Sequence, residues 1–202
     1  KETVDYLVEE KNENVGLLEV HLYRPFSSKY FLKALPKSVK KIAVLDRTKE
    51  PGSAGEPLYL DVIKTIKNVD ARVSVIGGRY GLSSKDTQPK HIKSVFDWML
   101  SGKEHHNFSV GIEDDVTNLS LEPVDIHVDA DYSTCLFYGL GADGTVGANK
   151  STVKIIGNNT DLYSQAYFAY DSKKAGGVTR SHLRFGPTPI HSPYYINKAD
   201  FI

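Results

Sequence analysis

The sequence is poor in cysteine, with Cys135 the only one among 202 residues. A single thiol excludes an internal disulfide, and it excludes an iron–sulfur cluster or a thiolate zinc site held by this chain alone. Scarce cysteine is typical of proteins from a reducing compartment. The first ten residues, KETVDYLVEE, are too charged for a secretory signal. We therefore expect a cytoplasmic protein, with an organellar location in some eukaryotes left open.

The chain also lacks an excess of either charge and any long apolar run. Its 25 lysines and arginines balance 25 aspartates and glutamates, so the formal net charge is zero. A neutral chain has no bulk attraction to nucleic acid or to an acidic membrane. No apolar run reaches the roughly 18 residues that a membrane span needs. We expect neither nucleic acid nor membrane as a partner, and the histidines lack the spacing of a metal site.

Strand-like and helix-like segments alternate over the first 115 residues. Apolar runs rich in Val, Ile and Leu predict strands at 15–23, 41–47, 71–79 and 108–115. Helical spacing of apolar residues predicts helices at 1–14, 27–38, 55–68 and 88–102. In the first of these helices Val4, Leu7 and Val8 should face inward. Such alternation predicts βαβ units with a parallel sheet, whose ligands meet the loops after the strands.

A change in composition separates this region from the next. Residues 117–131 have weak strand propensity and are interrupted by Pro123, which indicates a linker or crossover. A second α/β unit then starts near residue 132. We place the two domains at 1–120 and 121–202.

The stretch FYGLGADGTVGANKSTVKIIG, residues 137–157, predicts a phosphate site. Gly139, Gly141 and Gly144 fit G-x-G-x-x-G between a strand and a helix. In this motif the first glycine permits a tight turn, the second lets a pyrophosphate approach, and the third lets helix and strand pack closely. Free N–H groups at the start of the helix favour an anion. The alternative is a glycine-rich turn that packs helix on strand and binds nothing.

A charged turn follows the next predicted strand, AYFAY. Asp171 ends that strand, and Ser172, Lys173 and Lys174 follow at once. Two ammonium groups and a hydroxyl beside a ribose site suit an extra phosphate monoester, such as that of NADP or coenzyme A. The alternative is a solvated charged turn.

Four long segments resemble the pyruvate:ferredoxin (flavodoxin) oxidoreductase family, which includes pyruvate:NADP oxidoreductases fused to a flavin reductase. They are residues 22–62, 75–89, 139–157 and 165–190. The resemblance implies a fragment of a longer enzyme. Residues 1–120 would be a transketolase C-terminal-like parallel-sheet domain that lacks its first strand, and 121–202 the truncated start of a Rossmann-like gamma domain.

The resemblance also implies a division of labour within the full-length enzyme. That enzyme oxidatively decarboxylates pyruvate to acetyl-CoA, using thiamine diphosphate, magnesium and iron–sulfur clusters that lie outside this chain. The chain should therefore carry no catalytic residue and be inactive alone. Its partners would be the remaining domains, a second copy in a homodimer, and ferredoxin, flavodoxin or a fused flavin reductase as electron acceptor.

For the gamma domain, the resemblance implies contacts to coenzyme A as substrate and favours it over NADP at this site. The residues that match the family's motifs are Gly144, Thr145, Val146, Asn149, Lys150, Ser172, Lys173 and Lys174. A different class of function stays open. Some sulfite reductase-like flavoprotein subunits carry a similar domain pair as an electron-transfer or interaction module without pyruvate chemistry.

Overall fold

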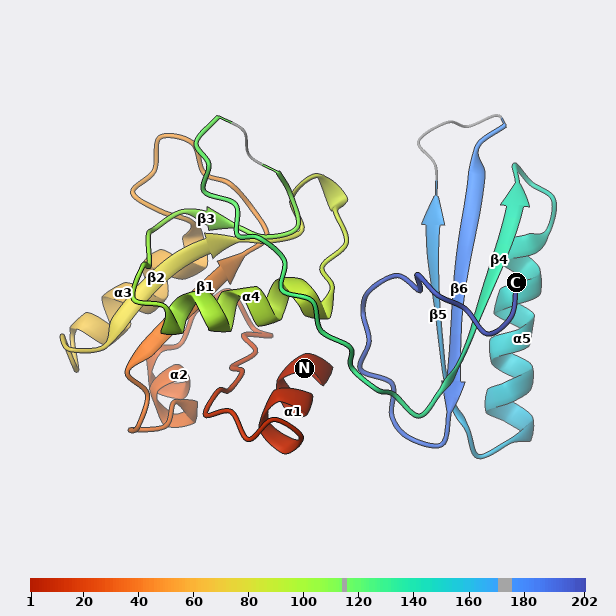
Figure 1. The fold of residues 1–202 in the computed structure, drawn as a ribbon, viewed down its shortest axis with the longest axis horizontal. Coiled ribbons are helices and arrows are strands. Elements are labelled where there is room, and N and C mark those ends of the chain that lie inside the picture. The colour runs from red at the N-terminus through yellow and green to blue at the C-terminus, as the bar shows by residue number, and fades with distance from the viewer. Residues whose placement is uncertain (114–115, 171–175) are drawn as a thin grey trace. The chain divides into compact units, whose positions relative to one another are not determined.

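The computed structural model describes residues 1–113, 116–170 and 176–202. The chain divides into two compact units, residues Lys1–Val128 and Asp129–Ile202 (Figure 1). We call them unit 1 and unit 2 and describe each by itself. The domain limits expected from the sequence, 1–120 and 121–202, stay a prediction.

A parallel sheet forms the centre of unit 1. Its strands lie in the order β1 (Lys41–Asp46), β2 (Ser74–Arg79) and β3 (Phe108–Ser109). These strands confirm three of the four expected from the apolar runs. Gly78 of β2 faces Phe108, and a Cβ at Gly78 would lie 2.2 Å from the Phe108 ring. Glycine at position 78 therefore leaves room for the fully buried Phe108 ring, which any larger residue would displace.

Helices cover both faces of this sheet. Unit 1 contains α1 (Glu2–Glu9), α2 (Ser28–Ala34), α3 (Pro57–Lys67), α4 (Pro89–Leu100) and the short 3₁₀ helix η1 (Leu82–Ser84). Neighbouring residues of β2 point to opposite faces. Val75 packs in a core with residues of α2 and α3, and Ile76 packs in a second core with residues of α4. This α/β arrangement confirms the predicted βαβ architecture.

Two predictions for unit 1 are wrong. Residues 15–23 form no strand. Leu18 and Val20 pack against the first core, so the apolar pattern reflects a single extended segment that is not part of a sheet. Val8 is 41% exposed, whereas Val4 and Leu7 are buried, because the buried stripe of the two-turn helix α1 is narrow.

Unit 2 is a three-stranded sheet with one helix. It contains β4 (Ser133–Leu140), α5 (Thr145–Asn159), β5 (Tyr163–Tyr170) and β6 (Val178–Gly186). The strand order is β4-β6-β5, and β6 runs antiparallel to both neighbours. β4 and β5 are thus parallel to each other, with β6 between them, and α5 packs against the sheet (Figure 1).

The antiparallel sheet corrects the expectation of a Rossmann-like parallel sheet in these residues. The difference lies in β6, which no apolar pattern predicted. Polar and charged side chains fill much of the strand, including Thr179, Ser181, His182 and Arg184, yet all four are buried. Such a strand is defined by its two neighbours rather than by its own hydrophobicity.

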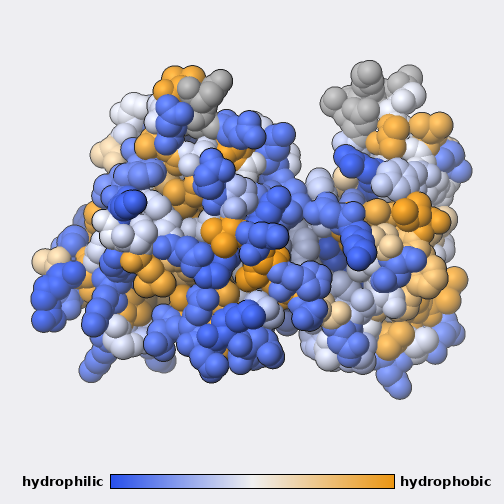
Figure 2. Space-filling model, in the orientation of Figure 1, coloured by the Kyte–Doolittle hydropathy of each residue, from blue (hydrophilic) through white to orange (hydrophobic). Residues whose placement is uncertain are grey.

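The last residues of the chain return to this sheet. Leu136 of β4 donates its backbone N–H to the carbonyl oxygen of Phe201 at 2.9 Å. The Asp200 carboxylate accepts from the backbone N–H and the hydroxyl of Thr134, at 2.8 Å each. Hydrophobic residues remain at the surface of unit 2 (Figure 2). The exposed aliphatic and phenylalanine side chains among them are Leu140, Ile155, Val178, Phe201 and Ile202.

Candidate functional site

The glycine motif forms the predicted strand–turn–helix. β4 ends at Leu140 and α5 begins at Thr145, with Gly144 as the N-cap residue. Gly141 and Gly144 have φ values of +61° and +89°, a region that favours glycine. The N–H of Gly141 donates to the carbonyl oxygen of Gly177 at 3.0 Å, so the turn is joined to the residue before β6.

The roles of the glycines differ from those expected of the motif. Gly139 permits the close approach, because a Cβ there would lie 2.7 Å from Oγ1 of Thr145 and 2.8 Å from Oδ1 of Asp143. A Cβ at Gly144 would meet nothing within 4 Å. Gly144 is therefore needed for its positive φ and not for helix–strand packing, which corrects the prediction.

Asp143 already places a negative charge at this turn. Its Oδ1 accepts the backbone N–H of Thr145 at 3.0 Å, and its Oδ2 accepts that of Leu140 at 2.9 Å. Hydrogen bonds from Thr145, and then from Leu140, lower the pKa of the carboxyl below its usual 3.8. Asp143 is thus ionised at neutral pH, and the N–H of Thr145 is not available to a ligand.

The next two N–H groups of α5 are open. The first bond of the helix runs from the N–H of Ala148 to the carbonyl oxygen of Gly144 at 2.9 Å. Among the residues that the structure describes, the N–H groups of Val146 and Gly147 have no acceptor. A Cβ at Gly147 would meet nothing within 4 Å. An anion therefore has room to approach these two donors.

Asn149 and Lys150 complete the described part of the predicted site. Asn149 is the buried residue of α5, with 0% exposure, and neither polar atom of its amide has a partner in the described chain. A buried polar group without a partner is costly and often marks a functional position. Lys150 is exposed, and its ammonium lies 5.6 Å from the centre of the Phe168 ring. That distance permits a cation–π contact.

The remaining predicted residues, Ser172, Lys173 and Lys174, lie outside the described residues, as does Asp171. The described residues that flank this segment, Tyr170 and Gly177, lie near the glycine turn. β5 ends at Tyr170, on the edge where its parallel neighbour β4 also ends, and Gly177 accepts from Gly141. The described residues that flank this segment therefore lie on the edge of the sheet where β4 and β5 end (Figure 1).

At the edge of unit 1 where the parallel strands end, the charged side chains of Asp46, Glu56 and Arg79 form hydrogen bonds and ion pairs within the unit. The Asp46 carboxylate accepts the N–H groups of Leu58 and Tyr59, at 2.9 and 3.0 Å, at the start of α3. Its pKa is raised because burial outweighs these hydrogen bonds. Arg79 donates from Nε to buried Glu56 at 2.7 Å. Asp46, Glu56 and Arg79 therefore stabilise unit 1.

Neither a metal cluster nor a membrane helix is found in the described ranges. No three His, Cys, Asp or Glu side chains gather there to hold a metal ion. None of the helices formed by those residues is long and apolar enough to span a bilayer.

Comparison with known proteins connects both units to one kind of enzyme. The model of "Pyruvate:ferredoxin oxidoreductase core domain II" matches residues 1–92, and that of "Pyruvate ferredoxin/flavodoxin oxidoreductase" matches residues 134–202. The chain is 61% identical over its full length to pyruvate-flavodoxin oxidoreductase of Enterobacter agglomerans. It is 58% identical to pyruvate:ferredoxin oxidoreductase of Moorella thermoacetica and 50% identical to pyruvate dehydrogenase (NADP+) of Cryptosporidium parvum.

The chain belongs to the pyruvate:ferredoxin (flavodoxin) oxidoreductase family. It spans 17% of the length of the first two relatives and 11% of the third. The domain II match covers most of the parallel-sheet unit, and the second match runs from β4 to Ile202. The resemblance seen in the sequence is thereby confirmed.

Asp143 is not among the site residues expected from the sequence of this family member. An Asp that bonds the N–H two residues ahead forms an Asx turn, and Asp is a common residue at helix starts. The order Asp-Gly-Thr before an expected helix was therefore the available signal. The partnerless amide of Asn149 had no such signal, because its burial depends on how α5 meets the sheet.

Proposed function

We propose that this chain is part of an enzyme that oxidatively decarboxylates pyruvate to acetyl-CoA and passes the electrons to ferredoxin or flavodoxin. Unit 2 contributes contacts to coenzyme A, and unit 1 is a scaffold. The names of the relatives support the reaction. The geometry of the glycine turn supports the contacts, since coenzyme A carries phosphate groups and the turn offers an anion two open donors.

One observation carries the proposal for unit 2. The N–H groups of Val146 and Gly147 are without acceptors, and the buried amide of Asn149 follows in the same helix without a partner. The two N–H groups are open to water or to an anion, and the buried amide has no partner in the described chain. A phosphate at the start of α5, with the adjoining pantetheine amides as hydrogen-bonding groups, is a ligand of the right chemistry.

The chain supplies no catalytic group in this proposal. Its single cysteine cannot hold an iron–sulfur cluster alone, so the clusters are assigned to other parts of the enzyme. The family resemblance assigns thiamine diphosphate and magnesium there as well. The chain alone should therefore release no carbon dioxide from pyruvate when thiamine diphosphate, magnesium and coenzyme A are supplied. Release above background would overturn this division of labour.

Two glycines of α5 provide a matched test of the contact. A Cβ at Gly147 would enter open space beside the free N–H groups, and a Cβ at Gly157 would meet only Oγ of Ser164 at 3.8 Å. Both Gly147→Ala and Gly157→Ala should raise the free energy of unfolding by about 0.5–1 kcal/mol, because alanine restricts the unfolded chain.

Only one of the two variants should affect the ligand. Measured by calorimetry on the intact protein that carries this sequence, Gly147→Ala should weaken coenzyme A by about tenfold or more, since the new methyl occupies the approach of the phosphate. Gly157→Ala should bind as the wild type does. Equal affinity of the two variants for coenzyme A would show that its phosphate does not bind at the start of α5.

A further inference from the structure

A segment after β6 crosses the sheet face of unit 2 that α5 does not cover (Figure 1). Phe168 of β5 faces α5, because the Lys150 ammonium lies 5.6 Å from the centre of its ring, so its neighbour Tyr167 points to the opposite face. The Tyr167 ring lies 5.5 Å from that of Tyr195, which belongs to this segment. We call residues 187–199 the strap.

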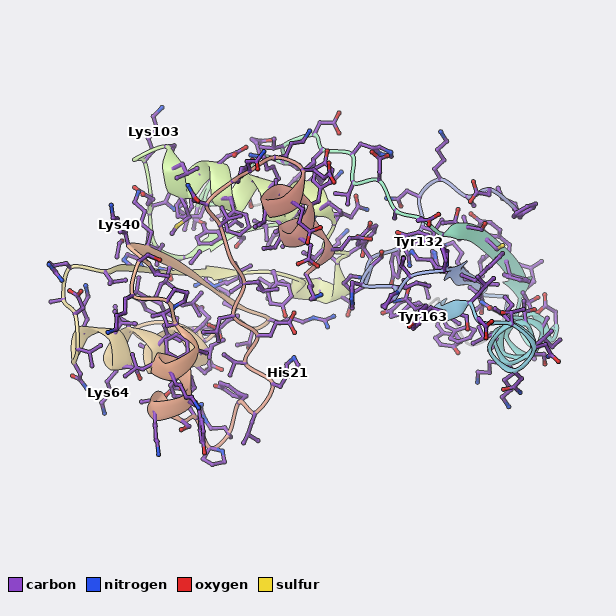
Figure 3. The ribbon with its side chains drawn as sticks, turned by 90° about the horizontal axis from the view of Figure 1, so that it is seen from below. His21, Lys40, Lys64, Lys103, Tyr132 and Tyr163 are labelled. Atoms are coloured by element: carbon purple, nitrogen blue, oxygen red, sulfur yellow. The ribbon has the colours of Figure 1, made fainter. Side chains whose placement is uncertain are left out.

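Polar contacts hold the strap more than apolar packing does. Of its residues, all of which the structure describes, Ile196 is the only apolar one that is buried. The hydroxyl of Tyr132, directly before β4, lies 2.8 Å from Oγ of Ser192 (Figure 3). The buried Arg184 donates to the carbonyl oxygen of Tyr194 at 2.6 Å. A segment with so little buried apolar surface opens more easily than the sheet it covers.

His182 of β6 makes a contact to the strap that depends on its protonation state. Its Nδ1 accepts the backbone N–H of Ile196 at 3.1 Å, and its ring stacks on that of Tyr195 with 4.9 Å between the centres. A ring nitrogen accepts a hydrogen bond only while it carries no proton. The closed strap therefore requires this nitrogen of the buried imidazole to be unprotonated.

Two cations flank His182 on the same strand. Residues two apart in a strand share a face, so Arg180, His182 and Arg184 point the same way. The register places Leu136 of β4 and Tyr167 of β5 opposite His182. None of these four neighbours is an acid that would stabilise a charged imidazole. A proton on His182 would thus add a third positive charge to this face.

Asp200, which follows the strap, keeps its charge over the pH range in which histidines titrate. Its carboxylate accepts from the backbone N–H and the hydroxyl of Thr134, and these bonds lower its pKa below the usual 3.8. Asp200 is therefore ionised at pH 5.5 and holds the end of the strap on β4. The strap's own histidine and lysine, His191 and Lys198, are exposed.

We propose that the strap opens when His182 takes up a proton. Opening breaks the bond to Ile196 and the stack on Tyr195 and uncovers the face around Tyr167, while both ends of the strap stay on the sheet. In the open strap His182 meets water, where a histidine has a pKa of about 6.5. Because the closed strap requires the neutral ring, it is most stable above pH 6.5 and loses stability as the pH falls. Between pH 7.5 and 5.5 the open population should rise about tenfold.

Hydrogen exchange of the intact protein, followed by mass spectrometry, tests the strap locally. After correction for intrinsic exchange rates, peptides that contain residues 194–196 should lose about tenfold in protection between pH 7.5 and 5.5. Peptides from residues 150–159 of α5 should keep their protection. His191→Asn, which removes the exposed histidine of the strap, should show the same loss as the wild type.

Two substitutions of His182 should abolish this pH dependence. His182→Asn keeps an acceptor that does not titrate, and His182→Phe keeps a ring that can stack on Tyr195. The phenylalanine variant should be less protected than the wild type already at pH 7.5, because the bond to Ile196 is lost. Unchanged protection of the wild-type strap at the two pH values would overturn the proposal. A tenfold loss in either His182 variant that folds would overturn it as well.

Discussion

The carboxylate of Asp143 accepts the backbone N–H of Thr145 at 3.0 Å and that of Leu140 at 2.9 Å. One side chain thus joins the end of β4 to the start of α5 across two glycines with positive φ. The same carboxylate brings a negative charge to a turn that we propose binds phosphate. Its hydrogen bonds favour binding by fixing the turn, and its charge opposes binding.

Asp143→Ala should weaken coenzyme A by about tenfold, because a ligand must then order the turn itself. The repulsion that the substitution removes acts between exposed groups and is screened by water and salt. The control is Asp161→Ala, which removes an exposed acid near the other end of α5. Tighter binding by Asp143→Ala would show that repulsion is the larger effect. Because the pKa of Asp143 is lowered, its contribution to stability is present at pH 7 and is lost as the pH falls from about 3.8 through the folded pKa.

Asn149→Leu should separate stability from binding. Replacing a buried amide without partners by an apolar side chain of similar size should raise the free energy of unfolding by roughly 1 kcal/mol. The same change should weaken coenzyme A, because the amide is then lost to the ligand. Asn158→Leu, on the exposed side of the helix, should change neither quantity by as much. Urea unfolding and calorimetry measure the two effects, and a loss of stability in Asn149→Leu would count against the assignment.

Arg79→Met should destabilise unit 1. Glu56 is 1% exposed and loses its ion-pair partner, which typically costs about 3–5 kcal/mol. Arg72→Met breaks an exposed pair with Asp70 and should leave the unfolding midpoint nearly unchanged. If both substitutions shift the urea unfolding midpoint equally, the Glu56–Arg79 pair is as well solvated as a surface pair.

His91 should make stability depend on pH. It is buried and its Nδ1 accepts the N–H of Gln88, and burial, followed by the nearby Lys90 charge, lowers its pKa. A lowered histidine pKa gives stability that is complete above the unfolded value of 6.5 and falls as the pH drops toward the folded value. The His91→Gln variant should therefore have a lower free energy of unfolding than the wild type near pH 7.5. The difference in free energy between the two proteins should be smaller at about pH 5.5. A difference that stays constant with pH would contradict this origin.

Apolar periodicity was enough to predict most of unit 1. The residues of β1, β2, α3 and α4 alternate or recur on one face, and each face meets a core. The prediction of a strand at 15–23 was wrong, because an apolar pattern indicates which residues are buried and does not indicate whether a neighbouring strand is present.

Unit 2 could be predicted only in part, for a different physical reason. The glycine turn was visible because positive φ values restrict the residue type. β6 could not be predicted, because its polar side chains are buried only through hydrogen bonds to residues distant in sequence. Arg184, for example, donates to Gln165 and Tyr194. The same long-range packing buries Asn149, so its amide could be assigned to the site but not recognised as partnerless.

We propose that unit 2 holds coenzyme A by its phosphates at the glycine turn and the start of α5, with Lys173 and Lys174 among the contacts. The most direct test compares coenzyme A with dephospho-coenzyme A on the intact protein and on a variant with both Lys173→Ala and Lys174→Ala. We expect the variant to weaken coenzyme A by about a hundredfold and to leave dephospho-coenzyme A unchanged, because the lysines pair with the 3′-phosphate. Equal weakening of both ligands, or of neither, would contradict this claim.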